Sequence, residues 1–365
     1  MDDLRTGLSY GDVLLVPKRS PVDSRGDVDL STRFTPGLEL RSPLVSAAMD
    51  TVTEGKLAAA LSRAGGIGVV HRFLTPEQQA AEVERVPDGE RVAAAVGIDE
   101  DHLARAERVL AAGADAVVVD VAHGHLERTL ETVGDIAAEF PDASLLAGNV
   151  ATPAGVRDLA AAGADGVKVG VGPGSHCTTR EVAGAGVPQL TAVDDCAEAA
   201  SKVGVTVCAD GGIRSSGDVV KALMAGADTV MLGSLFAGTE EAPGAVVEVG
   251  GDRYKRSRGM ATTAAAEARE DKGEADPDAD EGVEALTPYK GPVTAVVEEL
   301  AAGVRSGLSY CGGQTIPAAR EEAEFVRVVE GAKERAGAHG DHDWEGVSVG
   351  SAAGDADTDP AEGDD

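Results

Sequence analysis

The chain has 365 residues, of which 63 are acidic and 32 are basic, so its formal net charge at neutral pH is −31. A field of this sign repels phosphate backbones, which excludes nucleic-acid binding through a basic groove. The length suits one large α/β domain or two average ones, and without a long apolar run or a signal segment we expect a soluble cytoplasmic protein that does not bind membranes.

Eight apolar runs separated by helical patterns are expected to form strands that are buried on both faces. In chain order they cover residues 43–49, 66–71, 92–97, 116–122, 144–150, 166–172, 206–212 and 229–236. Three of these runs follow the same unit, in which a helix ends at Ala-Gly-Ala-Asp and a β-branched run begins, as is typical of αβ units. The expected helix starts are Thr75-Pro76 with Gln78, Thr152-Pro153, and Ser216 before Asp218.

Eight parallel strands that alternate with helices predict an α/β fold of the (β/α)8 TIM-barrel type. The alternative is a Rossmann-like open sheet, but the fingerprint Gly-x-Gly-x-x-Gly is absent after the first strand. We expect residues 1–335 to form one catalytic domain with a flap, defined as residues 261–289, after the eighth strand. Residues 336–365 are expected to form an acidic, disordered tail.

In a TIM barrel, catalytic groups lie in the loops that follow the strands. Six distinctive segments follow predicted strands: SAAMDTVT, DVAHGH, AGNV, GPGSHCTTR, ADGGIRSSGD and MLGSLFAG. We therefore expect a single site at the carboxyl ends of the strands. The last two segments have the glycines and the serine of a barrel phosphate site, although simple turn geometry is an alternative role for the glycines.

The segment GPGSHCTTR, residues 172–180, places Cys177 after a glycine-rich turn and before two threonines. Backbone N–H groups and hydroxyls in such a setting stabilise a thiolate, the nucleophilic form of cysteine. The alternative is a small buried hydrophobe, and this is what we expect for Cys196, Cys208 and Cys311, which lack such neighbours. We interpret Cys177 as a nucleophile. The spacing of the four cysteines indicates neither a disulfide framework nor a zinc site.

These motifs, in this order, resemble the IMP dehydrogenase and GMP reductase family, from YGDVLLVPKRS at Tyr10 to EFVRV at Glu324. The resemblance implies a TIM barrel, commonly a homotetramer, that binds GMP or IMP and a nicotinamide cofactor, NADPH or NAD. It implies that Cys177 attacks C2 of the purine and forms a covalent thioimidate. Thr179 and Glu281 match a pair that handles protons near C2, although Glu281 lies in an acidic run that can also be a solvated face.

The same resemblance assigns further residues. The substrate-binding positions are Ser46, Met49, Ser175, Asp210, Gly212, Gly233, Ser234, Met260 and Gly282. Among these, Asp210 would hold the ribose, and the 5′-phosphate would be held by Ser175, Gly212, Gly233 and Ser234. The cofactor would lie against Asp120, Asn149 and Gly170. A monovalent cation such as potassium would bind the carbonyl oxygens of Gly172, Gly174 and Cys177.

Departures from the family pattern bear on the reaction. The segment VERVPDGERVAAAVG leads directly into the third strand, without the CBS domains that most of the dehydrogenases insert there. The flap also lacks the Arg-Tyr pair with which the dehydrogenases activate water, because Arg269 is followed by Glu270. In contrast, SAAMDTVTE, DGGIRSSGD and RSGLSYCGG are closer to the dehydrogenases, and Asp278 stands where reductases usually have an arginine. Ser257 replaces a tyrosine that usually helps to bind phosphate.

Oxidation of IMP must end with activated water, whereas reduction of GMP needs ammonia to leave and a hydride to arrive. A flap without the Arg-Tyr pair can still support reduction, so we expect NADPH-dependent reductive deamination of GMP to IMP. One alternative is an IMP dehydrogenase that makes XMP with NAD and uses Arg269 as a relocated base. A non-catalytic nucleotide-binding relative and a barrel enzyme for phosphorylated sugars are others, but neither accounts for the turn around Cys177.

The charge pattern also predicts the conditions under which the protein is stable. Lysines and aromatic residues are few, a composition typical of proteins from cells that keep molar salt in the cytoplasm. At molar salt the Debye length is about 3 Å, so repulsion among surface carboxylates is screened. The alternative is an ordinary acidic surface.

Overall fold

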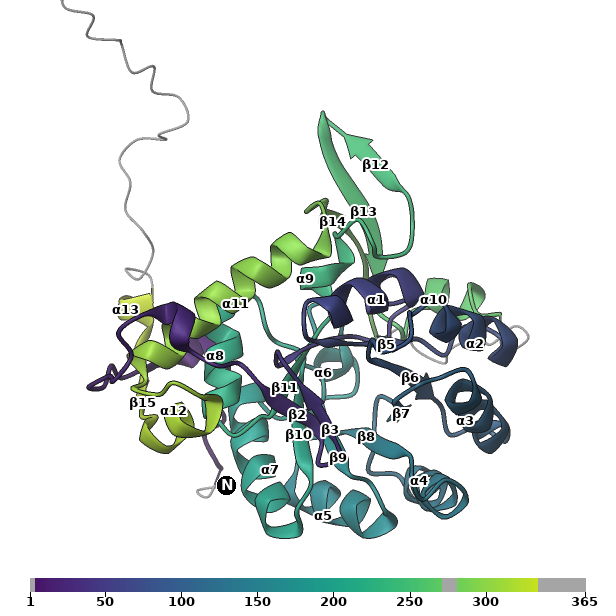
Figure 1. Cartoon of the computed structure of the whole chain (residues 1–365), viewed down its shortest axis with the longest axis horizontal. Helices are drawn as coiled ribbons and strands as arrows, with labels where there is room; N and C mark the ends of the chain where they lie inside the picture. Colours follow the sequence, from purple (N-terminus) through teal and green to yellow (C-terminus); the bar gives the residue numbers. More distant parts are fainter. Residues whose placement is uncertain (1–3, 271–280, 334–365) are drawn as a thin grey trace, which may run out of the picture. The chain divides into compact units, whose positions relative to one another are not determined.

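The computed structural model describes residues 4–270 and 281–333. Eight parallel strands close into a barrel, which confirms the predicted TIM barrel (Figure 1). The strands are β4 Leu44–Ser46, β5 Ile67–Val70, β6 Val92–Val96, β7 Ala116–Asp120, β8 Ser144–Val150, β9 Gly166–Val169, β10 Thr206–Asp210 and β11 Thr229–Leu232. Each of them lies within one of the eight predicted runs.

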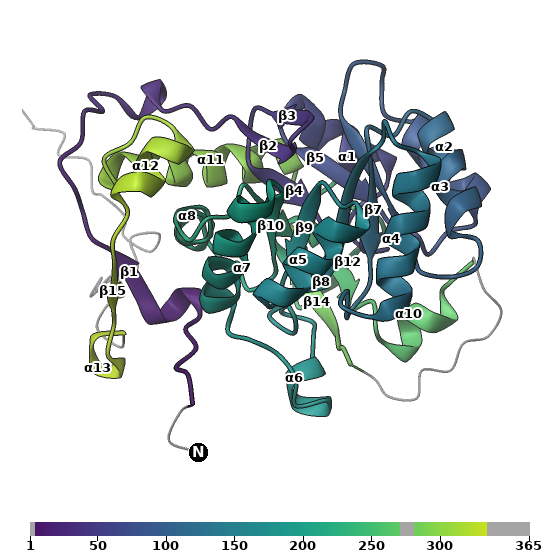
Figure 2. The same cartoon turned by 90° about the horizontal axis from the view of Figure 1, so that it is seen from below.

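Helices cover the outside of the barrel strands (Figure 2). The longer ones are α1 Gly55–Arg63, α2 Pro76–Glu84, α3 His102–Ala111, α4 Glu127–Glu139, α5 Pro153–Ala162, α7 Gln189–Val203, α8 Ser216–Met224 and α11 Val293–Tyr310. The shorter ones are α6 Thr179–Val182, α9 Ser234–Ala237, α10 Thr263–Glu267 and α12 Ile316–Glu322, with 3-10 turns η1 Tyr10–Asp12 and η2 Arg25–Asp27. None of the described helices is long and apolar enough to cross a bilayer.

Two of the three expected helix caps are confirmed, and the third needs a correction of one residue. Thr75 forms a capping box with Gln78, and the Thr152 hydroxyl accepts a hydrogen bond at the start of α5. Helix α8 is capped by Ser215 rather than by Ser216. The reason is geometric, because Ser215 has extended backbone angles while its hydroxyl accepts from the amide of Asp218, whereas Ser216 is already helical.

A hairpin that was not predicted closes the amino-terminal end of the barrel. Its strands are β2 Thr32–Thr35 and β3 Leu38–Leu40. Phe34 is fully buried among barrel-interior residues, and its carbonyl accepts from the Thr206 hydroxyl, which lies at the start of β10. The hairpin therefore seals the end opposite to the one where TIM-barrel sites lie.

A second feature that the sequence did not reveal is a three-stranded antiparallel sheet outside the barrel (Figure 1). Its strands are β12 Val246–Val249, β13 Asp252–Arg258 and β14 Glu284–Pro288. The described parts of the flap contain regular structure that the sequence did not reveal: α10 lies near its start, and β14 pairs with β13 near its end. Asp278 and the rest of residues 271–280 lie outside the described residues.

Strand β1 Val13–Leu15 pairs with β15 Phe325–Arg327, so both ends of the first compact unit, Met1–Arg327, meet in one small sheet. A second unit begins at Val328 and includes α13 Glu330–Lys333. The predicted tail, residues 336–365, lies outside the described residues. Three cysteines are buried as predicted, namely Cys196, Cys208 and Cys311, and no described cysteine forms a disulfide.

Candidate active site

A cavity of about 520 Å³ lies at the carboxyl ends of the barrel strands, where the sequence predicted a site. The structure brings most of the predicted site residues to its wall: Met49, Asp120, Asn149, Gly170, Gly172, Gly174, Ser175, Cys177, Thr179, Asp210, Gly212, Gly233, Ser234, Met260 and Glu281. Two do not line it. Ser46 is fully buried in β4 and accepts a hydrogen bond from the Thr53 hydroxyl at 2.8 Å. Gly282 lies behind the wall, paired with Cys177 in an antiparallel bridge.

Cys177 begins a hydrogen-bonded path that ends at a carboxylate. It lies in the loop between β9 and α6, and its Sγ donates to Thr179 Oγ1 at 3.2 Å. The Thr179 hydroxyl in turn donates to Glu281 Oε2 at 2.6 Å. Each group of the path is within hydrogen-bond reach of the next, which is the geometry that general acid–base catalysis requires. A proton can therefore pass between the sulfur and the carboxylate.

Backbone pairing brings Glu281 to Cys177 from a distant part of the chain. The Thr178 amide donates to the Glu281 carbonyl at 3.1 Å, and the Val283 amide donates to the His176 carbonyl at 3.0 Å. Gly282 lies between these two bonds, where a Cβ atom would stand 2.8 Å from Thr262 Cγ2. Only glycine fits without displacing a neighbour, so its role here is close packing of the flap against the cysteine loop.

Sequence analysis missed Lys168, whose side chain joins three predicted site residues. Its Nζ atom lies 2.8 Å from Asp120 Oδ1 and 2.5 Å from Asp210 Oδ2, and it also donates to Asn149 Oδ1. Burial lowers the pKa of Lys168, but the charges of Asp120 and Asp210 outweigh it, so the pKa lies above its ordinary value. The ammonium group is therefore charged. The available signal was a lysine inside the apolar run GVKVG, since buried lysines are rare unless they are paired.

His176 was also missed, and it occupies the wall next to Cys177. Its Nε2 atom lies 2.9 Å from Ser257 Oγ, and its Nδ1 atom lies 3.3 Å from Ser175 Oγ. Ser257 is 1 % exposed and is also bonded to the Thr287 hydroxyl. Ser257 therefore supports the cysteine loop from behind. Burial lowers the pKa of His176, which favours the neutral imidazole.

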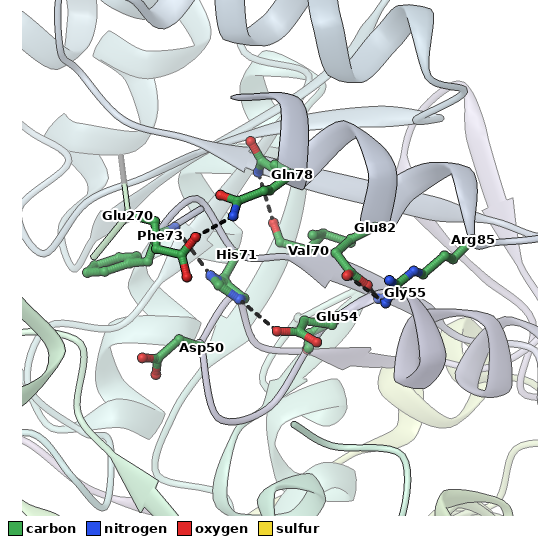
Figure 3. A network of polar contacts seen from close by, with 12 residues as sticks. Asp50, Glu54, Gly55, Val70, His71, Phe73, Gln78, Glu82, Arg85 and Glu270 are labelled. Carbon is green, nitrogen blue, oxygen red and sulfur yellow. Dashed lines mark hydrogen bonds and ion pairs between the residues drawn. The ribbon is translucent and has the colours of Figure 1, made fainter. Parts of the chain in front are cut away.

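The end of the α10 region is fixed to the loop after β5 (Figure 3). The Glu270 amide donates to the Phe73 carbonyl at 3.1 Å, and the Gln78 side chain donates to the Glu270 carboxylate. His71 supports the same loop, because its Nδ1 accepts from the Phe73 amide at 3.2 Å. The guanidinium of Arg269 lies 4.5 Å from the centre of the Phe73 ring and lines the cavity.

The fold and the site define a TIM barrel with a cysteine that is linked through a threonine hydroxyl to a carboxylate. The chain matches the family model described as IMP dehydrogenase / GMP reductase domain over residues 7–339. It therefore belongs to the IMP dehydrogenase and GMP reductase family, whose members are oxidoreductases that bind purine nucleotides.

Similar proteins include members with both names. An inosine-5′-monophosphate dehydrogenase of Nitrosopumilus maritimus is 38 % identical over 89 % of this chain and 96 % of its own. One of Borreliella burgdorferi is 36 % identical over 89 % of this chain and 94 % of its own. Among solved structures, a GMP reductase C318A from Trypanosoma brucei in complex with guanosine 5′-monophosphate has a TM-score of 0.89 and 31 % identity, and covers 93 % of this chain and 99 % of its own.

The two dehydrogenases differ in how much they add to the shared barrel. The alignment of this chain with the Nitrosopumilus protein spans 459 positions, more than the 365 residues of this chain, so that relative has residues without a counterpart here. The alignment with the Borreliella protein spans only 382 positions. A protein named as a dehydrogenase can thus be almost as short as this one, and the missing insertion does not by itself distinguish the two reactions.

Proposed function

We propose that the protein catalyses the NADPH-dependent reductive deamination of GMP to IMP and ammonia. The single observation that carries the proposal is the path from Cys177 through Thr179 to Glu281. Loss of ammonia from C2 of the purine requires a nucleophile and a proton for the departing amine. This path supplies both from neighbouring side chains.

The protons of the first step balance within these three residues. As Cys177 Sγ attacks C2, its proton passes through the Thr179 hydroxyl to the Glu281 carboxylate. The same proton then returns through Thr179 to the 2-amino group, so the C–N bond breaks and ammonia leaves. The product of this step is the purine joined to sulfur in a thioimidate, with Glu281 again ionised.

The second half of the reaction uses the other wall of the cavity. Bound reduced nicotinamide supplies the hydride that replaces sulfur at C2. Asp120 and Asn149 line the cavity together with Cys177, so they can hold the nicotinamide against the purine. Gly170 lines the cavity beside them, and glycine is needed there because a Cβ would stand 2.1 Å from the Asp210 carbonyl. The thiolate that leaves C2 takes up one proton from solvent, which can reach it through Glu281 and Thr179.

The nucleotide would lie between this wall and the loops after β10 and β11. Asp210 would accept from the ribose hydroxyls, and Ser175, Gly212 and Ser234 line the cavity where a 5′-phosphate can meet backbone amides and hydroxyls. The carbonyls of Gly172, Gly174 and Cys177 form an oxygen-only donor set that suits a hard monovalent cation such as potassium. The Gly174 carbonyl also accepts from the Cys177 amide at 3.1 Å, which keeps the turn compact.

IMP dehydrogenase activity is the second candidate, and two observations favour it. Arg269 lines the same cavity as Cys177, where a relocated base would have to lie. The relatives from Nitrosopumilus and Borreliella also carry the name of a dehydrogenase. In the structure, however, the Arg269 guanidinium stacks on Phe73, and the next residue, Glu270, is bonded to Gln78.

Assays in both directions test the proposal. Purified protein in high salt with potassium is given GMP with NADPH, and in parallel IMP with NAD, and the purine products and ammonia are quantified. We expect IMP and ammonia to form in equal amounts with oxidised cofactor in the first assay. Sustained formation of XMP from IMP, with no turnover of GMP, would contradict the proposal and establish the second candidate.

A further inference from the structure

We propose that Lys168 is a positioning residue that fixes the nucleotide-binding and the cofactor-binding side chains of the cavity relative to each other. The inference rests on the proposed function, in which Asp210 contacts the ribose while Asp120 and Asn149 contact the nicotinamide. Through one ammonium group Lys168 contacts all three.

The barrel topology explains why a single side chain can do this. Strands β7, β8, β9 and β10 are neighbours in the closed sheet, and each contributes one member of the cluster at its carboxyl end. The members are Asp120, Asn149, Lys168 and Asp210, and all four line the cavity. Lys168 lies on β9, between β8 and β10. Its long side chain reaches Asn149 on β8, Asp210 on β10 and, beyond β8, Asp120 on β7.

The solvent exposure of each side chain in the cluster indicates which of them can contact a ligand in the cavity. The Lys168 side chain is 3 % exposed, whereas those of Asp120 and Asp210 are 25 % and 21 % exposed. Lys168 and Asn149 both bond to Oδ2 of Asp210, which leaves the other carboxylate oxygen for a ribose hydroxyl. The lysine therefore acts through the carboxylates.

Charge makes this arrangement depend on Lys168. Two carboxylates share one buried ammonium group, and removal of one partner of a buried pair leaves the other charge uncompensated. Without Lys168, the two carboxylates repel each other, and each is free to turn away from its ligand. Arg72 also lines the cavity, and its Nε donates to the backbone carbonyl of Asp120, at 3.3 Å.

The test is the pattern of binding losses across variants. Lys168→Met keeps the length of the side chain and removes its charge. We expect it to raise the dissociation constants of both GMP and NADPH, each measured separately by calorimetry, by at least about tenfold. Asp210→Asn should weaken mainly GMP binding and Asp120→Asn mainly NADPH binding. Lys168→Arg, which keeps the charge, should recover part of both losses.

Lys255→Met is the matched control. Lys255 is also buried, at 2 % exposure, but it lies on β13 and donates to the carbonyls of Glu240 and Ala242 rather than to carboxylates. A loss of stability without change in either dissociation constant is expected for this variant. Equal effects of the two lysine substitutions on binding would overturn the proposal, as would a Lys168→Met enzyme that loses affinity for only one ligand.

If Lys168→Met does not fold, the double variant Lys168→Met with Asp120→Asn removes one carboxylate together with the ammonium. It should bind GMP at least about tenfold more weakly than Asp120→Asn alone, and equal affinities would overturn the proposal.

Failure of the proposed function gives a different experimental result. A wild-type protein that binds GMP without converting it to IMP contradicts the reaction, while the binding pattern still decides the role of Lys168.

Discussion

Lys168 and its partners lie on four neighbouring barrel strands, whereas Thr179 and Glu281 are separated by 102 residues and meet through loops. The first wall of the cavity is fixed as soon as the barrel closes, because the strand order alone brings its side chains together. The second wall requires the flap to return and pair with the cysteine loop. The cluster around Lys168 is thus built into the barrel strands, while Thr179 and Glu281, the proposed proton-transfer groups, come together outside them.

The largest expected effect concerns the nucleophile on the loop-built wall. Cys177→Ala should lower turnover by at least about 10⁴-fold, since no other group can form the thioimidate, while GMP still binds to the barrel wall. Burial raises the pKa of Cys208 to about 12, so Cys208→Ala is a control that should retain activity. Steady-state rates, together with mass spectrometry for a nucleotide adduct on Cys177, check this. A Cys177→Ala enzyme with a near-normal rate would rule out the mechanism.

The next effect separates the two candidate reactions. Glu281→Gln should slow NADPH oxidation with GMP by about 100-fold or more, because the amine then leaves without a proton donor. Arg269→Ala should change that rate little, since no water needs activation. Rates of both variants with GMP and with IMP provide the measurement. A severe loss with Arg269→Ala and a mild one with Glu281→Gln would support the dehydrogenase.

A smaller effect is expected from the backbone contact that joins the flap to the cysteine loop. In Gly282→Ala, the new methyl group must displace Thr262 or the His176 carbonyl, which costs about 1–3 kcal/mol and shifts Glu281. We expect kcat to fall while the dissociation constant of GMP changes little. Gly11→Ala is the matched control, because nothing lies within 4 Å of a Cβ atom there and its φ is not positive. Gly244 also has open space around it, but its positive φ would strain an alanine. An unchanged kcat in Gly282→Ala would show that this contact does not set the position of Glu281.

The smallest expected effect per residue is the dependence of stability on salt, to which acidic residues over the whole surface contribute. The net charge of −31 predicts that the melting temperature rises by at least about 5 °C between dilute and molar salt, because salt screens repulsion between exposed carboxylates. The Lys168 cluster is buried and should contribute little to this rise, so Lys168→Met should show the same slope as the wild type. Thermal unfolding at salt concentrations from dilute to molar is the measurement. A melting temperature that does not change with salt would indicate an ordinary acidic surface.

The barrel was predictable because each strand is a continuous apolar run with a turn motif at its end. Most of the predicted cavity residues, which the family resemblance assigned, lie in the segments that follow those ends. The cap of α8 was misplaced by one residue because Ser215 and Ser216 have the same side chain and only the backbone angles distinguish them. Strand β13 was missed because its buried residues, Lys255 and Ser257, are polar and give no apolar alternation. Strands β12 and β14 are short and mostly exposed. Lys168 and His176 were missed because their partners, Asp210 and Ser257, are far away in sequence.

The pairing at the base of the flap has an evolutionary consequence. The Glu281 amide donates to the Ala261 carbonyl at 2.9 Å, and the Gly259 amide donates to the Val283 carbonyl at 3.1 Å. The segment between Ala261 and Glu281 thus begins and ends at adjacent points, and the entropic cost of lengthening a segment closed in this way is only about 0.6 kcal/mol per doubling. Relatives can therefore differ in the length of this segment at a small cost in stability, while the barrel and its Lys168 cluster stay the same.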